Sequence, residues 1–129
     1  MKLKNMNLNK DWDAWCDRGG KHGVVNKRRA AMDCRDKAGK IRGYYSDLVL
    51  NPKKEQTHSL YPSIDHVNPR DNSDIKVEAR VFNDMKSHLT EKEFWLVIDH
   101  LYSVGRAKNK IKNSMPRRLS PSWRPRKNY

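Results

Sequence analysis

The stretch from residue 61 to residue 89 carries the pattern that most limits how this chain can fold. Residues 61–67 alternate weakly between apolar and polar side chains, and Pro69 follows closely, which is typical of a short strand. Residues 68–73 are dense in turn formers. The next residues have the period of a half-buried strand, with Ile75, Val77 and Ala79 alternating with Lys76, Glu78 and Arg80. With a helix expected to start near residues 81–83, the order is strand, turn, strand, helix, which predicts an α+β fold.

Further elements are expected on both sides of this hairpin. A helix over about residues 26–37 is expected, with Gly39 and Gly43 ending it. Residues 44–50 are interpreted as another strand. Residues 90–93 have the spacing of a capping box, which indicates a helix that ends at Gly105, a favourable residue after a helix end. The apolar stripe of that helix comprises Phe94, Val97 or Ile98, and Leu101.

Two tryptophans stand out in the polar first 24 residues. Trp12 and Trp15 are three residues apart, which places them on one side of a helical turn. One interpretation is a lid that packs on the core, and the other is a platform on which nucleic-acid bases stack. The lid is the preferred interpretation.

The charge of the chain points to a polyanionic partner. The 129 residues contain 28 Lys and Arg against 15 Asp and Glu, a formal net charge of +13. Such a charge repels itself unless a polyanion neutralises it, and nucleic acid is the expected partner. The alternative, a charge that serves solubility alone, stays open.

The cysteines and the N-terminus bear on the compartment. Cys16 and Cys34 form no CxxC pair, and two reduced thiols are preferred over a disulfide. The first residues lack the apolar region of a signal peptide, and no run is long enough to cross a membrane. We therefore expect a cytoplasmic protein with no membrane partner.

The distribution of charge suggests three regions. Residues 1–60 are expected to form a basic N-terminal region that packs on the core, and residues 61–105 are expected to be the core with its following helix. Residues 106–129 hold nine Lys and Arg, no acid and several prolines, which predicts a flexible basic tail that lies along a phosphate backbone. A merely solvated tail is the alternative.

A motif lies on the predicted hairpin. Residues 65–69 read Asp-His-Val-Asn-Pro and match the DH(I/V)xP signature of HNH nucleases, the His-Me finger or ββα-metal superfamily. Residues 74–87 can be laid on the second half of that motif, N-L-x-x-L-C-R-x-C-(H/N)-x-x-K-S, with Asn83 at the final His/Asn position. The chain thus resembles this superfamily over about a fifth of its length, and is closest to endonuclease VII-like members with an Asp-His…Asn arrangement. The resemblance implies a small ββα-metal core with flanking helices and a basic C-terminal tail.

The resemblance also implies roles for individual residues. His66 would be the general base, since an imidazole with a pKa near ~6.5 can accept a proton from water. Asp65 and Asn83 would bind Mg²⁺ or Mn²⁺, which prefer oxygen ligands. Asp74 would orient His66 through a backbone or imidazole contact. Because Asp74 stands where Asn is usual, its charge is expected to raise the pKa of His66.

One part of the family pattern is missing. The two zinc-binding cysteines are replaced by Ala79 and Phe82, so no structural zinc is expected. Apolar packing by Phe82, Met85 and Phe94 is expected to take its place.

The expected activity is hydrolysis of DNA phosphodiester bonds that leaves 5′-phosphate and 3′-hydroxyl ends, as in the family, with RNA not excluded. The phosphate contacts are expected from six basic residues, Arg70, Arg80, Lys86, Arg106, Lys108 and Lys110. The alternative is a non-catalytic, basic nucleic-acid-binding protein with a degenerate ββα site. By resemblance alone, a compact protein of this kind suggests a phage or mobile-element setting, and its oligomeric state is left open.

Overall fold

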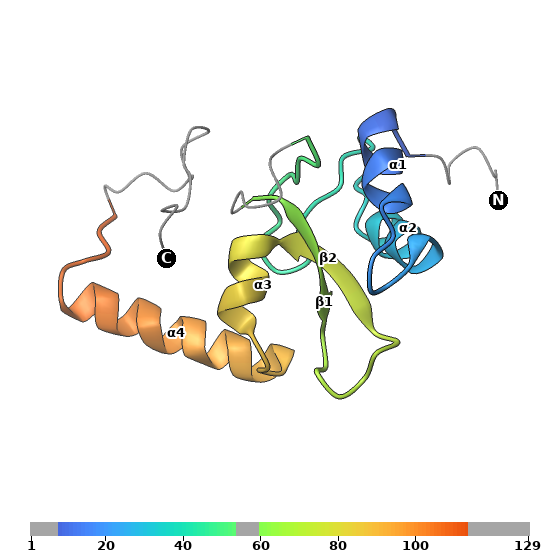
Figure 1. The fold of residues 1–129 in the computed structure, drawn as a ribbon. Coiled ribbons are helices and arrows are strands. Elements are labelled where there is room, and N and C mark those ends of the chain that lie inside the picture. Colours follow the sequence, from blue (N-terminus) through green and yellow to red (C-terminus); the bar gives the residue numbers. More distant parts are fainter. Residues whose placement is uncertain (1–7, 54–59, 114–129) are drawn as a thin grey trace, which may run out of the picture.

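The computed structural model describes residues 8–53 and 60–113 (Figure 1). Its elements are α1 (Lys10–Asp17), α2 (Val24–Asp33), β1 (Pro62–His66), β2 (Ile75–Ala79), α3 (Arg80–Lys86) and α4 (Glu91–Ala107). Strands β1 and β2 form one two-stranded antiparallel sheet. The prediction of a small α+β fold is confirmed.

The predicted hairpin forms, and its two strands pair residue by residue. Asp65 pairs with Lys76 and His66 pairs with Ile75. The Val67 amide donates to the Asp74 carbonyl at 3.0 Å, just beyond the last pair of β1 and β2. Helix α3 follows β2 directly, and the Arg80 amide donates to the Tyr61 carbonyl at 2.9 Å. This bond fixes the start of α3 beside the start of β1.

The core lies between the hairpin and the two N-terminal helices. Trp12 and Trp15 are buried and meet edge to face, with ring centroids 5.3 Å apart. They pack in one cluster with the small side chains of α2 and the inward face of β2, namely Ala30, Ala31, Val77 and Ala79. The tryptophans therefore belong to the core, as the lid interpretation predicts, and are not available as a stacking platform.

The prediction of a strand over residues 44–50 is wrong. The chain forms only isolated bridges here, Arg35 with Ile41 and Arg42 with Val49. The carboxylate of Glu78 is fully buried and accepts hydrogen bonds from the backbone amides of Tyr45 at 2.6 Å and Ser46 at 2.8 Å. Because these amides bond to a side chain, they cannot join a strand ladder, and the segment turns back instead.

Helix α4 begins as predicted, but it ends later. The Thr90 hydroxyl accepts from the Glu93 amide and the Glu93 carboxylate accepts from the Thr90 amide, which confirms the capping box. The helix continues past Gly105 to Ala107, so the prediction that Gly105 ends it is wrong. Gly105 serves close packing instead, because an added Cβ would lie 2.6 Å from the side chain of Ile111.

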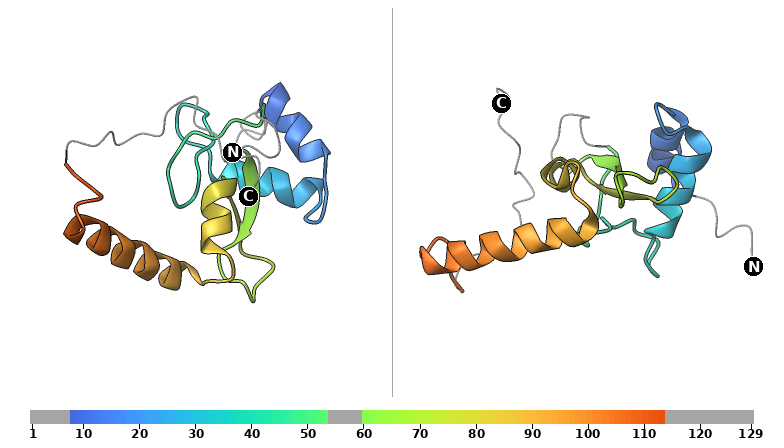
Figure 2. Two further views of the ribbon diagram at one scale, coloured as in Figure 1. Left: turned by 60° about the vertical axis from the view of Figure 1, so that its left-hand side comes forward. Right: turned by 90° about the horizontal axis from the view of Figure 1, so that it is seen from below.

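Helix α4 projects from the rest of the molecule (Figures 1 and 2). Phe94 in its first turn is buried, whereas Val97 and Leu101 of the predicted apolar stripe are exposed. Met85 is also exposed, so the expected packing by Met85 is wrong, while Phe82 is partly buried against the core.

Both cysteines are free thiols, as preferred. Helix α2 starts and ends a few residues earlier than predicted. Among the described residues, no helix is both long and apolar enough to traverse a bilayer. Residues 114–129, most of the predicted basic tail, lie outside the described residues.

Candidate functional site where α3 crosses β1

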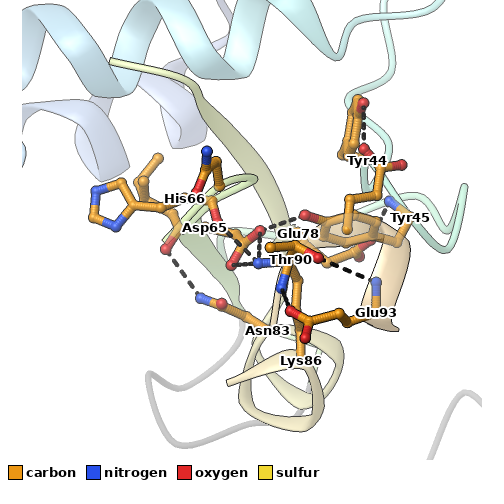
Figure 3. A network of polar contacts seen from close by, with 12 residues as sticks. Tyr44, Tyr45, Asp65, His66, Glu78, Asn83, Lys86, Thr90 and Glu93 are labelled. Carbon is orange, nitrogen blue, oxygen red and sulfur yellow. Dashed lines mark hydrogen bonds and ion pairs between the residues drawn. The ribbon is translucent and has the colours of Figure 1, made fainter. Parts of the chain in front are cut away.

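Asn83 attaches helix α3 to strand β1 (Figure 3). Its side-chain amide nitrogen donates to the Ser63 hydroxyl at 2.9 Å and to the Ile64 carbonyl at 3.0 Å. A backbone carbonyl can only accept, so the nitrogen must face Ile64 and the amide oxygen must face the other way. That oxygen has no hydrogen-bond partner within residues 8–53 and 60–113. Asn83 therefore retains one unused oxygen beside the strand that carries Asp65 and His66.

Asp65, in β1, is buried against Lys86, which lies about one turn after Asn83 in α3. The Asp65 side chain is nearly inaccessible, with the residue 3% exposed. The Tyr45 hydroxyl donates to one carboxylate oxygen at 2.5 Å, and the Lys86 ammonium lies 3.4 Å from each of the two oxygens. In Figure 3 the carboxylate points toward Lys86 and Tyr45, while the Asn83 bond leads to the strand backbone. Of the two predicted metal ligands, Asp65 belongs to β1 and Asn83 contacts β1 from α3. Their side chains bond to different partners.

Burial governs the electrostatics of this cluster. Loss of solvent raises the pKa of Asp65, and the Tyr45 hydrogen bond and the Lys86 ammonium oppose that rise. Burial and then the bond to Asp65 also raise the pKa of the Tyr45 hydroxyl, so Tyr45 stays a proton donor. Lys86 is fully buried and donates to the His66 carbonyl at 2.9 Å. The carboxylate is therefore neutralised by a cation that belongs to the chain itself.

His66, at the end of β1, is half-buried and meets a second histidine. The ring of His22 packs edge-on against it, with centroids 5.1 Å apart. Burial and then the neighbouring His66 lower the pKa of His22, which favours its neutral form near pH 7. His22 was not singled out from the sequence because it belongs to no motif. It reaches the site through the loop between α1 and α2, where Gly20 and Gly23 have positive φ.

Asp74 contacts the end of β1 through its backbone. Its carbonyl accepts the Val67 amide, one residue after His66, whereas its side chain is exposed. Within the described part of the chain, no hydrogen bond joins the Asp74 carboxylate to the His66 imidazole. Asp74 therefore acts on the position of His66 by closing the hairpin.

The basic residues expected to contact phosphate fall in three places. Arg70 is exposed in the hairpin loop, and Arg80 is exposed at the start of α3, with its guanidinium 3.7 Å from the Asp84 carboxylate. Lys86 is buried, so its expected role as a surface phosphate contact is not supported, because its ammonium is engaged by β1. The other three, Arg106, Lys108 and Lys110, are exposed at the far end of α4 and away from the hairpin (Figure 1).

A cleft opens beside the junction of β1 and α3. It has a volume of about 450 Å³ and lies between the α1–α2 loop, β1 and α3. Several of its lining side chains are basic or polar, among them Arg18, His22, Lys27, Ser63, Arg80 and Asn83. Lys27 is turned inward, where it donates to the Trp15 carbonyl at 2.5 Å and burial lowers its pKa. The wall thus presents the guanidinium groups of Arg18 and Arg80 together with the Asp84 carboxylate, and Asp65 and His66 are not among its lining residues.

The donor set fits a hard divalent cation in kind. Mg²⁺ is commonly held by one or two protein oxygens, with water and phosphate completing its shell. Asp65 supplies a carboxylate, and Asn83 supplies the amide oxygen that lacks a partner. No group of three or more His, Cys, Asp and Glu side chains suited to a metal occurs in the described ranges, so protein ligands alone would not complete a shell. Asp65 would also have to exchange the Lys86 ammonium for the ion.

Comparisons with protein-family models, with curated proteins and with solved structures found no match to this chain.

Proposed function

We propose that the protein is a metal-dependent endonuclease of the HNH type that hydrolyses phosphodiester bonds in DNA. The observation that carries the proposal is the position of Asn83. Its side chain bonds to Ser63 and Ile64, which precede Asp65 and His66 in β1, and its amide oxygen has no hydrogen-bond partner among the described residues. The order and spacing of Asp65, His66 and Asn83 are those of the HNH motif. The element order β1, β2, α3 agrees with a ββα-metal core.

Each residue has a distinct part in the proposed reaction. His66 accepts a proton from the attacking water, and the edge contact with His22 and the backbone bond at Asp74 hold the strand end that carries it. Asp65 and Asn83 would hold the divalent ion, with Asp65 released from Lys86. When bound, the ion supplies Lewis acidity that stabilises negative charge on the phosphate and the leaving oxygen.

Binding of DNA is supported by charge rather than by a sequence-reading element. The net charge of +13 and the basic stretches 26–43 and 106–127 favour contacts with the phosphate backbone. The cleft beside Asn83 gives a phosphodiester access to the junction of β1 and α3. We therefore expect cleavage with little sequence preference.

Plasmid nicking tests the proposal. The full chain should convert supercoiled plasmid to open circles with Mg²⁺ or Mn²⁺, and EDTA should stop the reaction. His66→Ala and Asn83→Ala should remove activity while binding persists, and His100→Ala, on the exposed side of α4, is the matched control. Nicking that survives chelation or His66→Ala would refute the proposal.

A second candidate is a nucleic-acid-binding protein that does not cleave. The Lys86–Asp65 ion pair favours it, because the carboxylate expected to bind metal already has a cation. This candidate predicts DNA affinity that is indifferent to Mg²⁺ and no nicks with any divalent ion. Filter binding and nicking on the same protein sample distinguish the two.

A further inference from the structure

Helix α4 presents an uncovered apolar face. One side of the helix carries the exposed side chains of Trp95, Leu101 and Tyr102 together with the half-buried Ile98, whereas the exposed Leu96 lies on the other side. An exposed apolar patch of this kind, on a helix that stands away from the body, marks an interaction surface. Among the described residues, no helix or strand lies along its middle (Figure 2).

Within the described residues, the contacts of α4 with other parts of the chain lie near its two ends. At the start, Phe94 packs against the ring of Tyr45, and the Tyr44 hydroxyl donates to Glu91 at 3.1 Å. At the end, the side chain of Ile111 folds back over Gly105. The uncovered stretch therefore lies between these contacts, where Leu101 and Tyr102 are 53% and 52% exposed.

We propose that α4 pairs with α4 of a second copy of this chain, antiparallel about a two-fold axis. The charges of the helix are arranged for this. Its first turn carries Glu91 and Glu93, and its last turn carries Arg106. An antiparallel pair places each acidic start against the basic end of the other copy, and a two-fold axis makes both contacts at once.

The spacing of residues gives a register. Glu91 and Trp95 are four residues apart, and so are Tyr102 and Arg106, which puts each pair on one side of the helix. Placing Trp95 opposite Tyr102 of the second copy therefore also places Glu91 opposite Arg106 of the second copy. Apolar side chains meet around the axis in this register, and the charges lie at its two ends.

A membrane surface fits this face less well than a second copy. Helices that lie on membranes have a polar face rich in Lys and Arg. The polar side of α4 is mixed in charge, with Lys92, Glu93, Asp99 and His100. A polar side of mixed charge is expected to face water. This agrees with a helix whose apolar side alone packs against another helix.

The first test measures the oligomeric state of the full chain by sedimentation equilibrium in buffer free of nucleic acid. We expect a reversible dimer. Leu101→Asp should raise the dimer dissociation constant by at least about tenfold, because it places a charge from each copy within one helical turn of the two-fold axis. Leu96→Asp is the matched control, since Leu96 is as exposed but lies on the other side of the helix. A monomer at all concentrations, or equal effects of the two substitutions, would overturn the proposal.

The second test uses charge exchange, which only an antiparallel pair of copies can satisfy. Glu91→Arg and Arg106→Glu should each weaken the dimer, since each brings like charges together. An equimolar mixture of the two variants should associate more tightly than either alone, because each interface then pairs opposite charges. Circular dichroism checks that each variant keeps its helices. A mixture that associates no better than its components contradicts the register, whatever the nuclease assay shows.

Discussion

The buried pair of Lys86 and Asp65 allows a sharp prediction. We expect Lys86→Met to destabilise the protein by about 3–5 kcal/mol near neutral pH. The substitution keeps most of the apolar stem and removes only the ammonium. It leaves the Asp65 carboxylate, 3% exposed, with the Tyr45 hydroxyl as its remaining donor. A buried charge without a counter-charge is among the most unfavourable features that one substitution can create.

The magnitude follows from the distances. The Lys86 nitrogen lies 3.4 Å from each Asp65 oxygen. Two unit charges at that distance attract by about 5 kcal/mol at an effective dielectric constant near 20. The Lys86 bond to the His66 carbonyl adds about 1 kcal/mol. Removing Lys86 also relieves the cost of burying an ammonium, which lowers the net effect. Small domains are stable by roughly 5–15 kcal/mol, so the variant should fold but unfold much more easily.

The effect should depend on pH in a defined direction. Burial raises the pKa of Asp65 in the folded protein, so the folded state binds more protons than the unfolded state between the two pKa values. The contribution of Asp65 to the free energy of unfolding is therefore greatest below the pKa that Asp65 has in the unfolded chain. It decreases as the pH rises toward the pKa that Asp65 has in the folded protein. Without Lys86 the folded pKa rises further. The loss caused by Lys86→Met should thus be larger near pH 8 than near pH 5.

Urea unfolding followed by tryptophan fluorescence measures these differences, since Trp12 and Trp15 are buried in the core. Lys92→Met, on the exposed side of α4, is the matched control and should change stability little. The double variant Asp65→Asn with Lys86→Met should recover most of the loss, because no buried charge remains. A loss below about 1 kcal/mol at both pH values, or a double variant as unstable as Lys86→Met alone, would refute the reasoning.

Three further outcomes are expected. Gly43→Ala should destabilise by more than about 2 kcal/mol in urea unfolding, because its Cβ would lie 1.9 Å from the Glu78 carboxylate; a neutral effect would contradict the packing around Glu78. Thr90→Ala should cost about 1 kcal/mol through loss of the α4 cap, and Thr90→Ser should not, in the same assay. DNA affinity measured by fluorescence anisotropy should fall steeply and log-linearly with salt, whereas a flat response would exclude phosphate contacts as the main source of binding.

The hairpin and its helices could be predicted because their signals are local. Alternation of apolar and charged residues fixes β2, and the capping box fixes the start of α4. The strand expected over residues 44–50 failed for a non-local reason. Glu78 sits where the alternation predicts a solvent-facing side chain, yet a loop covers that face and bonds to its carboxylate. A period of two separates the faces of a strand but does not tell which is covered.

The candidate site shows the same division. The motif predicts Asp65, His66 and Asn83, but no local pattern indicates that His22 or Tyr45 would contact them, because both come from loops of the N-terminal half. Lys86 was foreseeable in part. It lies three residues after Asn83, so both side chains project from the same side of α3 toward β1. Because a lysine on a short polar helix is usually exposed, Lys86 was predicted to contact phosphate and not to pair with Asp65.

The buried Asp65–Lys86 ion pair is expected to stabilise the fold less than two apolar side chains would, so stability alone does not explain why it is there. An ion pair moved out of water gains little over apolar side chains of the same size, because desolvation offsets most of the attraction. Leu or Met at both positions would fill the junction of β1 and α3 without that cost. The chain instead keeps a buried carboxylate in β1, next to His66 in the strand to which the Asn83 side chain is bonded. Local sequence choices that reduce stability are expected where chemistry or binding requires them. If Asp65 holds a divalent ion as proposed, the Lys86 ammonium would balance its charge whenever that ion is absent.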